Sequence, residues 1–220
     1  MSMTLIHKWI VGLASVLCLS MAQGQGNDAA CPMVAKSIAI DAGSISYLQG
    51  GQGPSILLLH GLFGQKEQWM DMACALANQG FNVIVPDLPG YGQSTVYPIA
   101  IYQLESQVTT LQRFMGSVSG KSFHIAGNSM EGAIAGLYSK QFPDEITSLA
   151  FIGAPLGVIS WSDQVRDSIN KGINPFIPID NAQFDIEMGL LFAQAPVISN
   201  DIKKQLVQEY RNNNRHYQQV

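Results

Sequence analysis

The chain has 220 residues, of which 47% are hydrophobic and 13% are charged, and its formal net charge is −4. This composition is typical of a folded domain with a sizeable core and excludes a disordered chain. Lysine and arginine form no long run, so the charge pattern gives no support to nucleic-acid binding.

Residues 1–22 have the pattern of a signal peptide. Lys8 supplies the positive charge, residues 9–21 are apolar, and residues 20–22 offer the small side chains that a signal peptidase reads. The apolar run is shorter than the roughly 20 residues that span a bilayer, which favours cleavage over an uncleaved membrane anchor. We therefore expect a secreted or periplasmic protein that meets the membrane only through this peptide, with residues 23–35 as an N-terminal arm.

Cleavage would leave two cysteines, Cys31 and Cys74. In an oxidising compartment they could form a disulfide. Alternatively, Cys74 is a buried helical residue and Cys31 lies in a loose arm, and the sequence leaves both readings open. No group of cysteines and histidines has metal-ligand spacing, so we predict no metal site.

Residues 36–155 alternate between short apolar runs and stretches of helical periodicity. In chain order, we predict strands at 37–40, 44–48 and 55–59, a helix through 69–76, a strand at 81–85, a helix over 104–118, a strand at 123–126, a helix over 130–138 and a strand at 149–152. Such alternation indicates βαβ units, and hence an α/β fold whose mostly parallel sheet carries helices on both faces.

The pattern changes after residue 155. No further buried strand is expected, and two helical stripes make residues 156–220 a predicted helical cap or lid, with Ser199 as a helix N-cap. Four apolar side chains in this region could line a substrate pocket or, equally, pack the cap. They are Phe176, Phe184, Met188 and Phe192.

Three motifs follow predicted strands, where open α/β sheets bind their ligands. They are HGLFG (60–64), DLPGYGQS (87–94) and GNSMEG (127–132). In this order and strand context, the chain from about residue 38 onward resembles the α/β-hydrolase superfamily. It looks most like the capped branch of bacterial lipases, esterases and hydrolases of meta-cleavage products, where the third motif commonly reads GNSMGG.

The resemblance implies a serine nucleophile, Ser129, on a tight strand-to-helix turn. The Met130 N–H would donate one hydrogen bond to the oxyanion, and the Leu62 N–H a second, with the Phe63 N–H as the alternative. Five further residues would support these groups: His60, Gly61, Gly127, Asn128 and Glu131.

Two features of these motifs need a physical account. Glu131 stands where the family usually has glycine, at a position that packs against a neighbouring strand. Burying an unpaired carboxylate there would cost several kcal/mol, so we expect Glu131 to weaken both folding and catalysis. Asp87, in contrast, is expected to pin its loop through hydrogen bonds rather than act as the catalytic acid.

The catalytic acid and base depart further from the family pattern than Glu131 does. The family order is serine, acid, histidine, and His216 is the only histidine after Ser129. Asp180 follows the stretch FIPI, which could be a truncated strand, but no βα unit surrounds either residue. The simpler interpretation is that the sequence ends within the cap, before the strands for acid and base. Strand 149–152 would then be an exposed edge, open to aggregation or partner pairing.

The resemblance therefore implies a secreted serine hydrolase that cleaves apolar carboxylic esters or lipids through an acyl-serine intermediate, without a cofactor and with impaired activity. One alternative is hydrolysis of a carbon–carbon bond in a ring-cleavage product. Another is an inactive chain that only binds an acyl ligand or a partner.

Overall fold

The computed structural model describes residues 30–220 except 121, 155, 158 and 159, so the predicted signal peptide lies outside the described residues. The chain divides after Leu156 into two compact units, and each is described by itself. None of the described helices has the combination of length and apolar character that crossing a bilayer requires.

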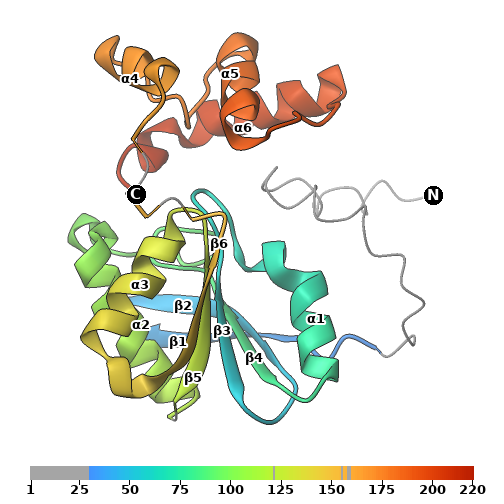
Figure 1. The fold of residues 1–220 in the computed structure, drawn as a ribbon, viewed down its shortest axis with the longest axis vertical. Helices are drawn as coiled ribbons and strands as arrows, with labels where there is room; N and C mark the ends of the chain where they lie inside the picture. Colours follow the sequence, from blue (N-terminus) through green and yellow to red (C-terminus); the bar gives the residue numbers. More distant parts are fainter. Residues whose placement is uncertain (1–29, 121, 155, 158–159) are drawn as a thin grey trace. The chain divides into compact units, whose positions relative to one another are not determined.

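The first unit is built on a six-stranded sheet of order β1-β2-β4-β3-β5-β6 (Figure 1). β1 and β2 form an antiparallel hairpin, β2 is antiparallel to β4, and β4, β3, β5 and β6 are mutually parallel. The strand bounds are Val34–Ile40 (β1), Gly43–Gly50 (β2), Ser55–Leu59 (β3), Asn82–Pro86 (β4), Phe123–Asn128 (β5) and Ile146–Ile152 (β6).

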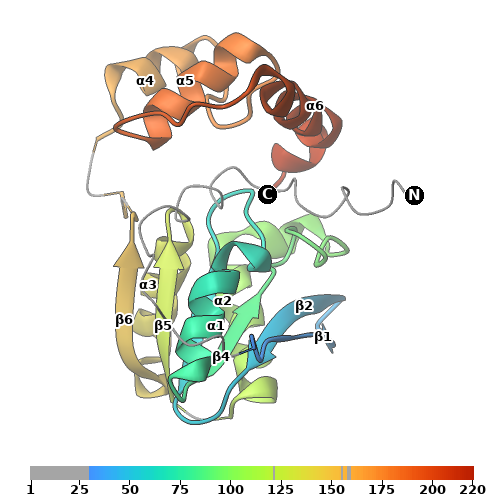
Figure 2. The ribbon, with the colours of Figure 1, turned by 90° about the vertical axis from the view of Figure 1, so that its right-hand side faces the viewer.

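Helices cover both faces of this sheet (Figure 2). α1 (Met70–Asn78) packs on one face, where its alanines join Trp69 and the apolar side chains of β3, β4 and β5. α2 (Leu104–Val118) and α3 (Glu131–Gln141) cover the other face. The described residues of this unit also form three short 3₁₀ helices: η2 (Lys66–Trp69), η3 (Ile99–Tyr102) and η4 (Pro143–Glu145). The predicted α/β architecture with a mostly parallel sheet is confirmed.

A disulfide joins Cys31 to Cys74, with their Cα atoms 4.9 Å apart, inside the usual range for such bonds. It ties the segment before β1 to α1. The sequence left two alternatives open, and the structure shows the disulfide. The alternative that Cys31 lies unpaired in a loose arm is wrong.

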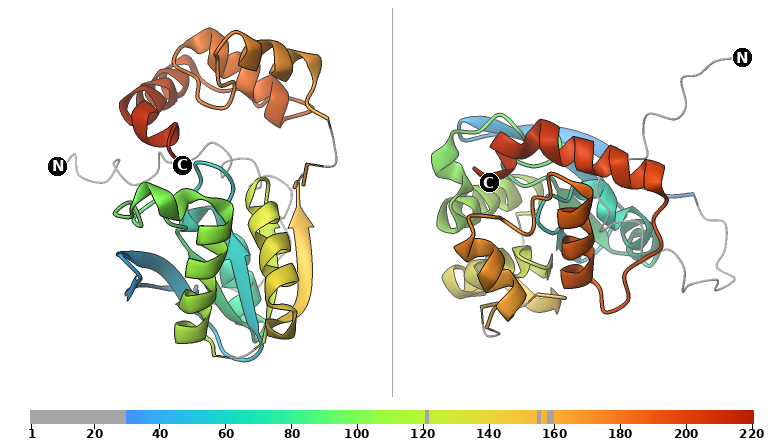
Figure 3. Two further views of the ribbon diagram at one scale, coloured as in Figure 1. Left: turned by 90° about the vertical axis from the view of Figure 1, so that its left-hand side faces the viewer. Right: turned by 90° about the horizontal axis from the view of Figure 1, so that it is seen from above.

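The second unit contains three helices in its described residues: α4 (Asp163–Asn170), α5 (Asn181–Leu191) and α6 (Asn200–Tyr217) (Figure 3, orange to red). Each has a side-chain N-cap, supplied by Ser162, Asp180 and Ser199 respectively. Stretch 176–179 forms turns and bends rather than a truncated strand, so that interpretation is wrong.

Apolar residues of α5 and α6 form the core of the second unit. Phe184 and Met188 are buried there against Leu206 and Val207, and Phe192 packs on the cluster. The structure thus shows that Phe184, Met188 and Phe192 pack within the unit. That they also line a substrate pocket stays a prediction.

Candidate active site

The three sequence motifs meet at one edge of the sheet. His60 follows β3, Asp87 follows β4, and Ser129 follows β5, and these strands run parallel to one another. The carboxyl ends of parallel strands lie at the same edge, so the residues that follow them gather there. This edge is the candidate site.

Ser129 lies on a sharp bend between β5 and α3. Its φ of 54° is in the left-handed region, where a non-glycine residue stores strain and therefore marks a candidate functional position. Its N–H donates to the Ile152 carbonyl oxygen at 2.9 Å, and its own carbonyl oxygen accepts from the Gly132 N–H at 3.1 Å. β6 and the first turn of α3 thus hold the bend in place. Ser129 is partly exposed, which leaves it accessible.

Two glycines allow β5 and α3 to approach this closely. A Cβ at Gly127 would lie 2.5 Å from the Glu131 carbonyl oxygen and 2.7 Å from the Gly132 Cα, and a Cβ at Gly132 would collide with Ala154. The contact with the segment after β6 is therefore made by Gly132, one position beyond the residue that is small in the family motif.

Glu131 has its side chain in the interior. It is fully buried, and neither carboxyl oxygen has a hydrogen-bond partner among the described residues. Burial raises the pKa of this carboxyl group well above its usual value, and the N–H of the same residue opposes that effect only in part. The Tyr91 hydroxyl is also buried and unpaired; burial and then the nearby Glu131 charge raise its pKa. The site therefore favours the neutral form of both groups.

The loop after β3 faces the bend. A Cβ at Gly61 would lie 3.4 Å from the Ser129 Cβ, and the Gly64 N–H closes the loop on the Gly61 carbonyl oxygen at 2.8 Å. Among the described residues, no acceptor receives the Leu62 or the Met130 backbone N–H. Backbone donors usually find a partner, so these two N–H groups are candidates to bind a ligand oxygen atom.

His60 connects the loops after β3 and β4. Its Nδ1 lies 3.0 Å from the Gly61 carbonyl oxygen, which can only accept, so Nδ1 carries the hydrogen. Its Nε2 accepts from the Leu88 N–H at 3.1 Å. Burial lowers the pKa of the ring, and its hydrogen bond to Gly61 opposes this. Since both ring nitrogens are engaged, His60 cannot take a proton from Ser129 in this arrangement.

Asp87 is buried and accepts three hydrogen bonds. Oδ1 accepts from the Lys66 N–H at 2.7 Å, and Oδ2 accepts from the Lys66 Nζ at 2.8 Å and from the Gln93 N–H at 2.9 Å. Lys66 is only 2% exposed, which sequence reasoning missed because lysine is seldom buried. The carboxylate is thus occupied in joining two loops.

The side chain of Gln68 links the β3 loop to the bend, a role that sequence reasoning also missed. Its Oε1 accepts from the Gly61 N–H at 3.3 Å, and its Nε2 donates to the Asn128 Oδ1 at 3.2 Å. Asn128 then donates from Nδ2 to the Ile152 carbonyl oxygen at 3.0 Å.

The other described histidines lie away from this edge or in the second unit. His124 is near the start of β5, at the opposite end from Ser129, and its Nδ1 lies 2.8 Å from the Ser148 Oγ. His216 belongs to α6, and the Asp180 carboxylate accepts from the Gln183 N–H at 2.8 Å as the cap of α5. The described residues of the first unit therefore show no histidine poised to activate Ser129.

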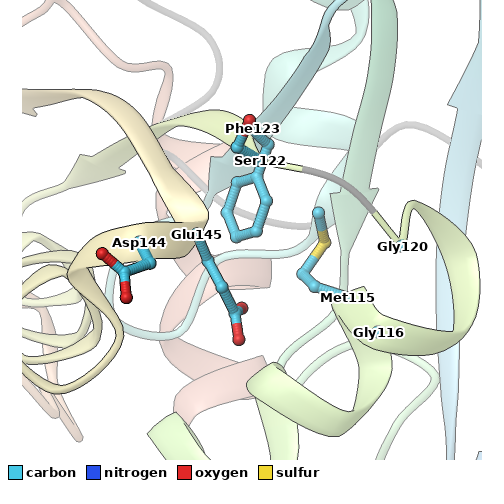
Figure 4. A pocket seen from close by; sticks show the side chains of 7 residues that line it. All are labelled: Met115, Gly116, Gly120, Ser122, Phe123, Asp144 and Glu145. Carbon is cyan, nitrogen blue, oxygen red and sulfur yellow. The ribbon is translucent and has the colours of Figure 1, made fainter.

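A hollow of about 270 Å³ lies elsewhere in the first unit (Figure 4). It is lined by Phe123, Asp144 and Glu145, among others, and Phe123 begins β5 whereas Ser129 follows its end. It is separate from the candidate site. The described residues contain no group of three or more histidine, cysteine or carboxylate side chains that could hold a metal ion.

Comparison with known proteins identifies relatives of this fold. A family profile described as the alpha/beta hydrolase fold matches residues 54–173. Lipase 3 of Moraxella sp. (strain TA144) is 31% identical over 165 residues, 73% of this chain and 51% of the relative. Lipase 1 of Psychrobacter immobilis is 28% identical over 181 residues, 79% of this chain and 56% of the relative. The chain thus spans about half the length of these curated relatives.

A solved structure of a membrane phospholipase A, described as a bacterial virulence factor, superposes with a TM-score of 0.74 at 28% sequence identity. The match covers 86% of this chain and 62% of that one.

Proposed function

Because this chain belongs to the alpha/beta hydrolase fold family, we propose that it is a serine hydrolase that cleaves carboxylic esters through an acyl-serine intermediate. The observation that carries the proposal is the strained bend at Ser129 between β5 and α3, which the loop at Gly61 approaches closely. The Met130 and Leu62 N–H groups, for which the described residues show no acceptor, belong to this bend and to that loop. Apolar or acyl-chain esters are the proposed substrates, since the relatives named above are lipases and a phospholipase.

In the proposed reaction, Ser129 Oγ attacks the ester carbonyl carbon, the alcohol leaves, and water then releases the acid from the acyl-serine. The Met130 and Leu62 N–H groups would stabilise the oxyanion, with Phe63 as the alternative to Leu62. Loss of one such donor typically lowers kcat by about 10²–10³-fold. The start of α3 adds the positive end of its helix dipole.

The proposed reaction needs a general base to accept the Ser129 proton. His60 has both nitrogens engaged, so the described part of the first unit supplies no histidine for the Ser129 proton. A serine without an adjacent base is a weak nucleophile. We therefore expect slow turnover that still depends on Ser129.

Export is the second part of the proposal. The pattern of residues 1–22 predicts a signal peptide. The disulfide between Cys31 and Cys74 supports an oxidising compartment, where such bonds persist.

The test compares hydrolysis of p-nitrophenyl butyrate by the native chain, by Ser129→Ala and by Ser122→Ala. Ser122 is exposed just before β5, at the far end from the site, so its variant controls for loss of a serine hydroxyl. We expect Ser129→Ala to fall to the buffer rate while Ser122→Ala retains the native rate. Equal rates in all three proteins would contradict the proposal.

The second candidate function is binding of an acyl ligand without turnover. The engaged nitrogens of His60 favour it, because the described residues of the first unit then offer no histidine to accept the Ser129 proton. Equal hydrolysis rates combined with saturable binding of a fatty acid, measured by calorimetry, would support this candidate instead.

A further inference from the structure

Gln68 forms a hydrogen-bonded link between the two segments that carry the proposed oxyanion donors. It accepts from the Gly61 N–H, next to Leu62, and donates to Asn128, two residues before Met130. Asn128 continues the link to the Ile152 carbonyl oxygen, the same atom that accepts from the Ser129 N–H. One side-chain amide thus spans the gap from the β3 loop to the bend.

The loop backbone is shaped around these two amides. A Cβ at Gly61 would lie 2.7 Å from the Asn128 Oδ1, and a Cβ at Gly64 would lie 2.6 Å from the Gln68 Oε1. Real Cβ atoms essentially never come this close to another heavy atom. Both glycines of the HGLFG motif therefore make room for one amide of the link.

The neighbours of Gln68 hold it in place. It lies on η2 between Lys66, whose ammonium group is buried against Asp87, and Trp69, which is buried in the core beneath α1. Its N–H donates to the Gln65 carbonyl oxygen at 3.0 Å. The backbone at Gln68 is therefore already fixed, and only its side-chain rotamers have to be ordered for it to bridge the two loops.

We propose that Gln68 is a positioning residue that sets the spacing between the Leu62 and Met130 N–H groups. The inference rests on the proposed function, because that spacing matters only if both groups bind one oxyanion. Misplacement of a catalytic group by about 1 Å can lower the rate about 10²-fold. Gln68 itself does not touch the substrate.

Two substitutions separate the bonds of the link. Gln68→Met keeps the length of the side chain and removes both hydrogen bonds. Gln68→Glu keeps an acceptor for the Gly61 N–H but opposes the Asn128 Oδ1 with a second acceptor. We expect both to lower kcat by about 10- to 100-fold with KM within about twofold of native. Gln79→Met, at an exposed glutamine just after α1, is the matched control and should leave kcat unchanged.

Amide hydrogen exchange, followed by NMR, tests the link without using activity. The Ser129 N–H bonds to Ile152 and not to Gln68, so it reports whether the link reaches the bend. In Gln68→Met we expect about tenfold or faster exchange at both Gly61 and Ser129, as when a protecting contact is lost. Faster exchange at Gly61 alone, or a lower melting temperature with unchanged kcat, would mean a local structural role and would overturn the inference.

The two arms also separate this inference from the proposed function. If the native chain shows no Ser129-dependent hydrolysis but Gln68→Met accelerates exchange at Ser129, the link exists and the proposed function is what fails. If hydrolysis depends on Ser129 and neither Gln68 variant changes kcat or the exchange at Ser129, the proposed function stands and the positioning role is refuted.

Discussion

Glu131 opposes the stability of the first unit, because its buried carboxyl group has no hydrogen-bond partner among the described residues. Leaving a buried polar group unpaired costs about 1–3 kcal/mol, whereas glycine in a helix costs about 1 kcal/mol relative to alanine. We therefore expect Glu131→Gly to raise Tm by a few degrees, at about 2–4 °C per kcal/mol for a chain of this size. Calorimetry would measure the change. Glu105→Gly, an exposed first-turn glutamate of α2, should lower Tm, and an unchanged or lower Tm for Glu131→Gly would refute the strain argument.

The same carboxyl group predicts a pH dependence. Its pKa is raised in the folded state, so the native protein keeps a proton that the unfolded chain releases. This contribution to stability is complete below the unfolded pKa of about 4.3 and is lost as pH rises toward the raised native value. Glu131→Gln should therefore gain stability relative to the native chain between pH 4 and pH 8, as urea unfolding at each pH would show. A constant difference across that range would contradict the burial of Glu131.

Among the elements, α1 and the segment before β1 are held together by the disulfide between Cys31 and Cys74. The bond closes a loop with a sequence separation of 43 residues, for which chain entropy predicts about 4 kcal/mol of stabilisation. We expect the Cys31→Ser/Cys74→Ser variant to lose about 2–4 kcal/mol in urea unfolding. Dithiothreitol should weaken the native chain by a similar amount and leave the variant unaffected; equal effects on both proteins would argue against a structural disulfide.

At the scale of the whole molecule, the sheet of the first unit ends at β6. This strand pairs with β5 on one side and is the last in the sheet order, with Ala150 and Phe151 exposed. Apolar edge strands promote self-association, and a lysine on such an edge suppresses it. We expect Ala150→Lys to scatter less light than the native chain at equal concentration. Ala42→Lys carries the same charge change in the β1–β2 turn and should behave like the native chain; an identical reduction in both variants would point to charge rather than the edge.

Hydrophobic periodicity by itself determined the order of strands and helices in residues 36–155. The spacing of apolar residues within each element shows which face packs in the core, without any information from the rest of the chain. The three motifs also located the candidate site, since they follow strands that proved parallel. α4 was missed because only two of its eight residues, Val165 and Ile169, are apolar, which makes a very short stripe.

Only the tertiary structure decided which distant polar groups meet. Lys66 and Asp87 are 21 residues apart, Cys31 and Cys74 are 43 apart, and Gln68 and Asn128 are 60 apart. Local periodicity reports which face of an element is apolar, but a hydrogen bond or ion pair needs two specific atoms within about 3 Å. That condition depends on how the loops after β3, β4 and β5 fold against one another, and so on contacts that no single stretch of sequence contains.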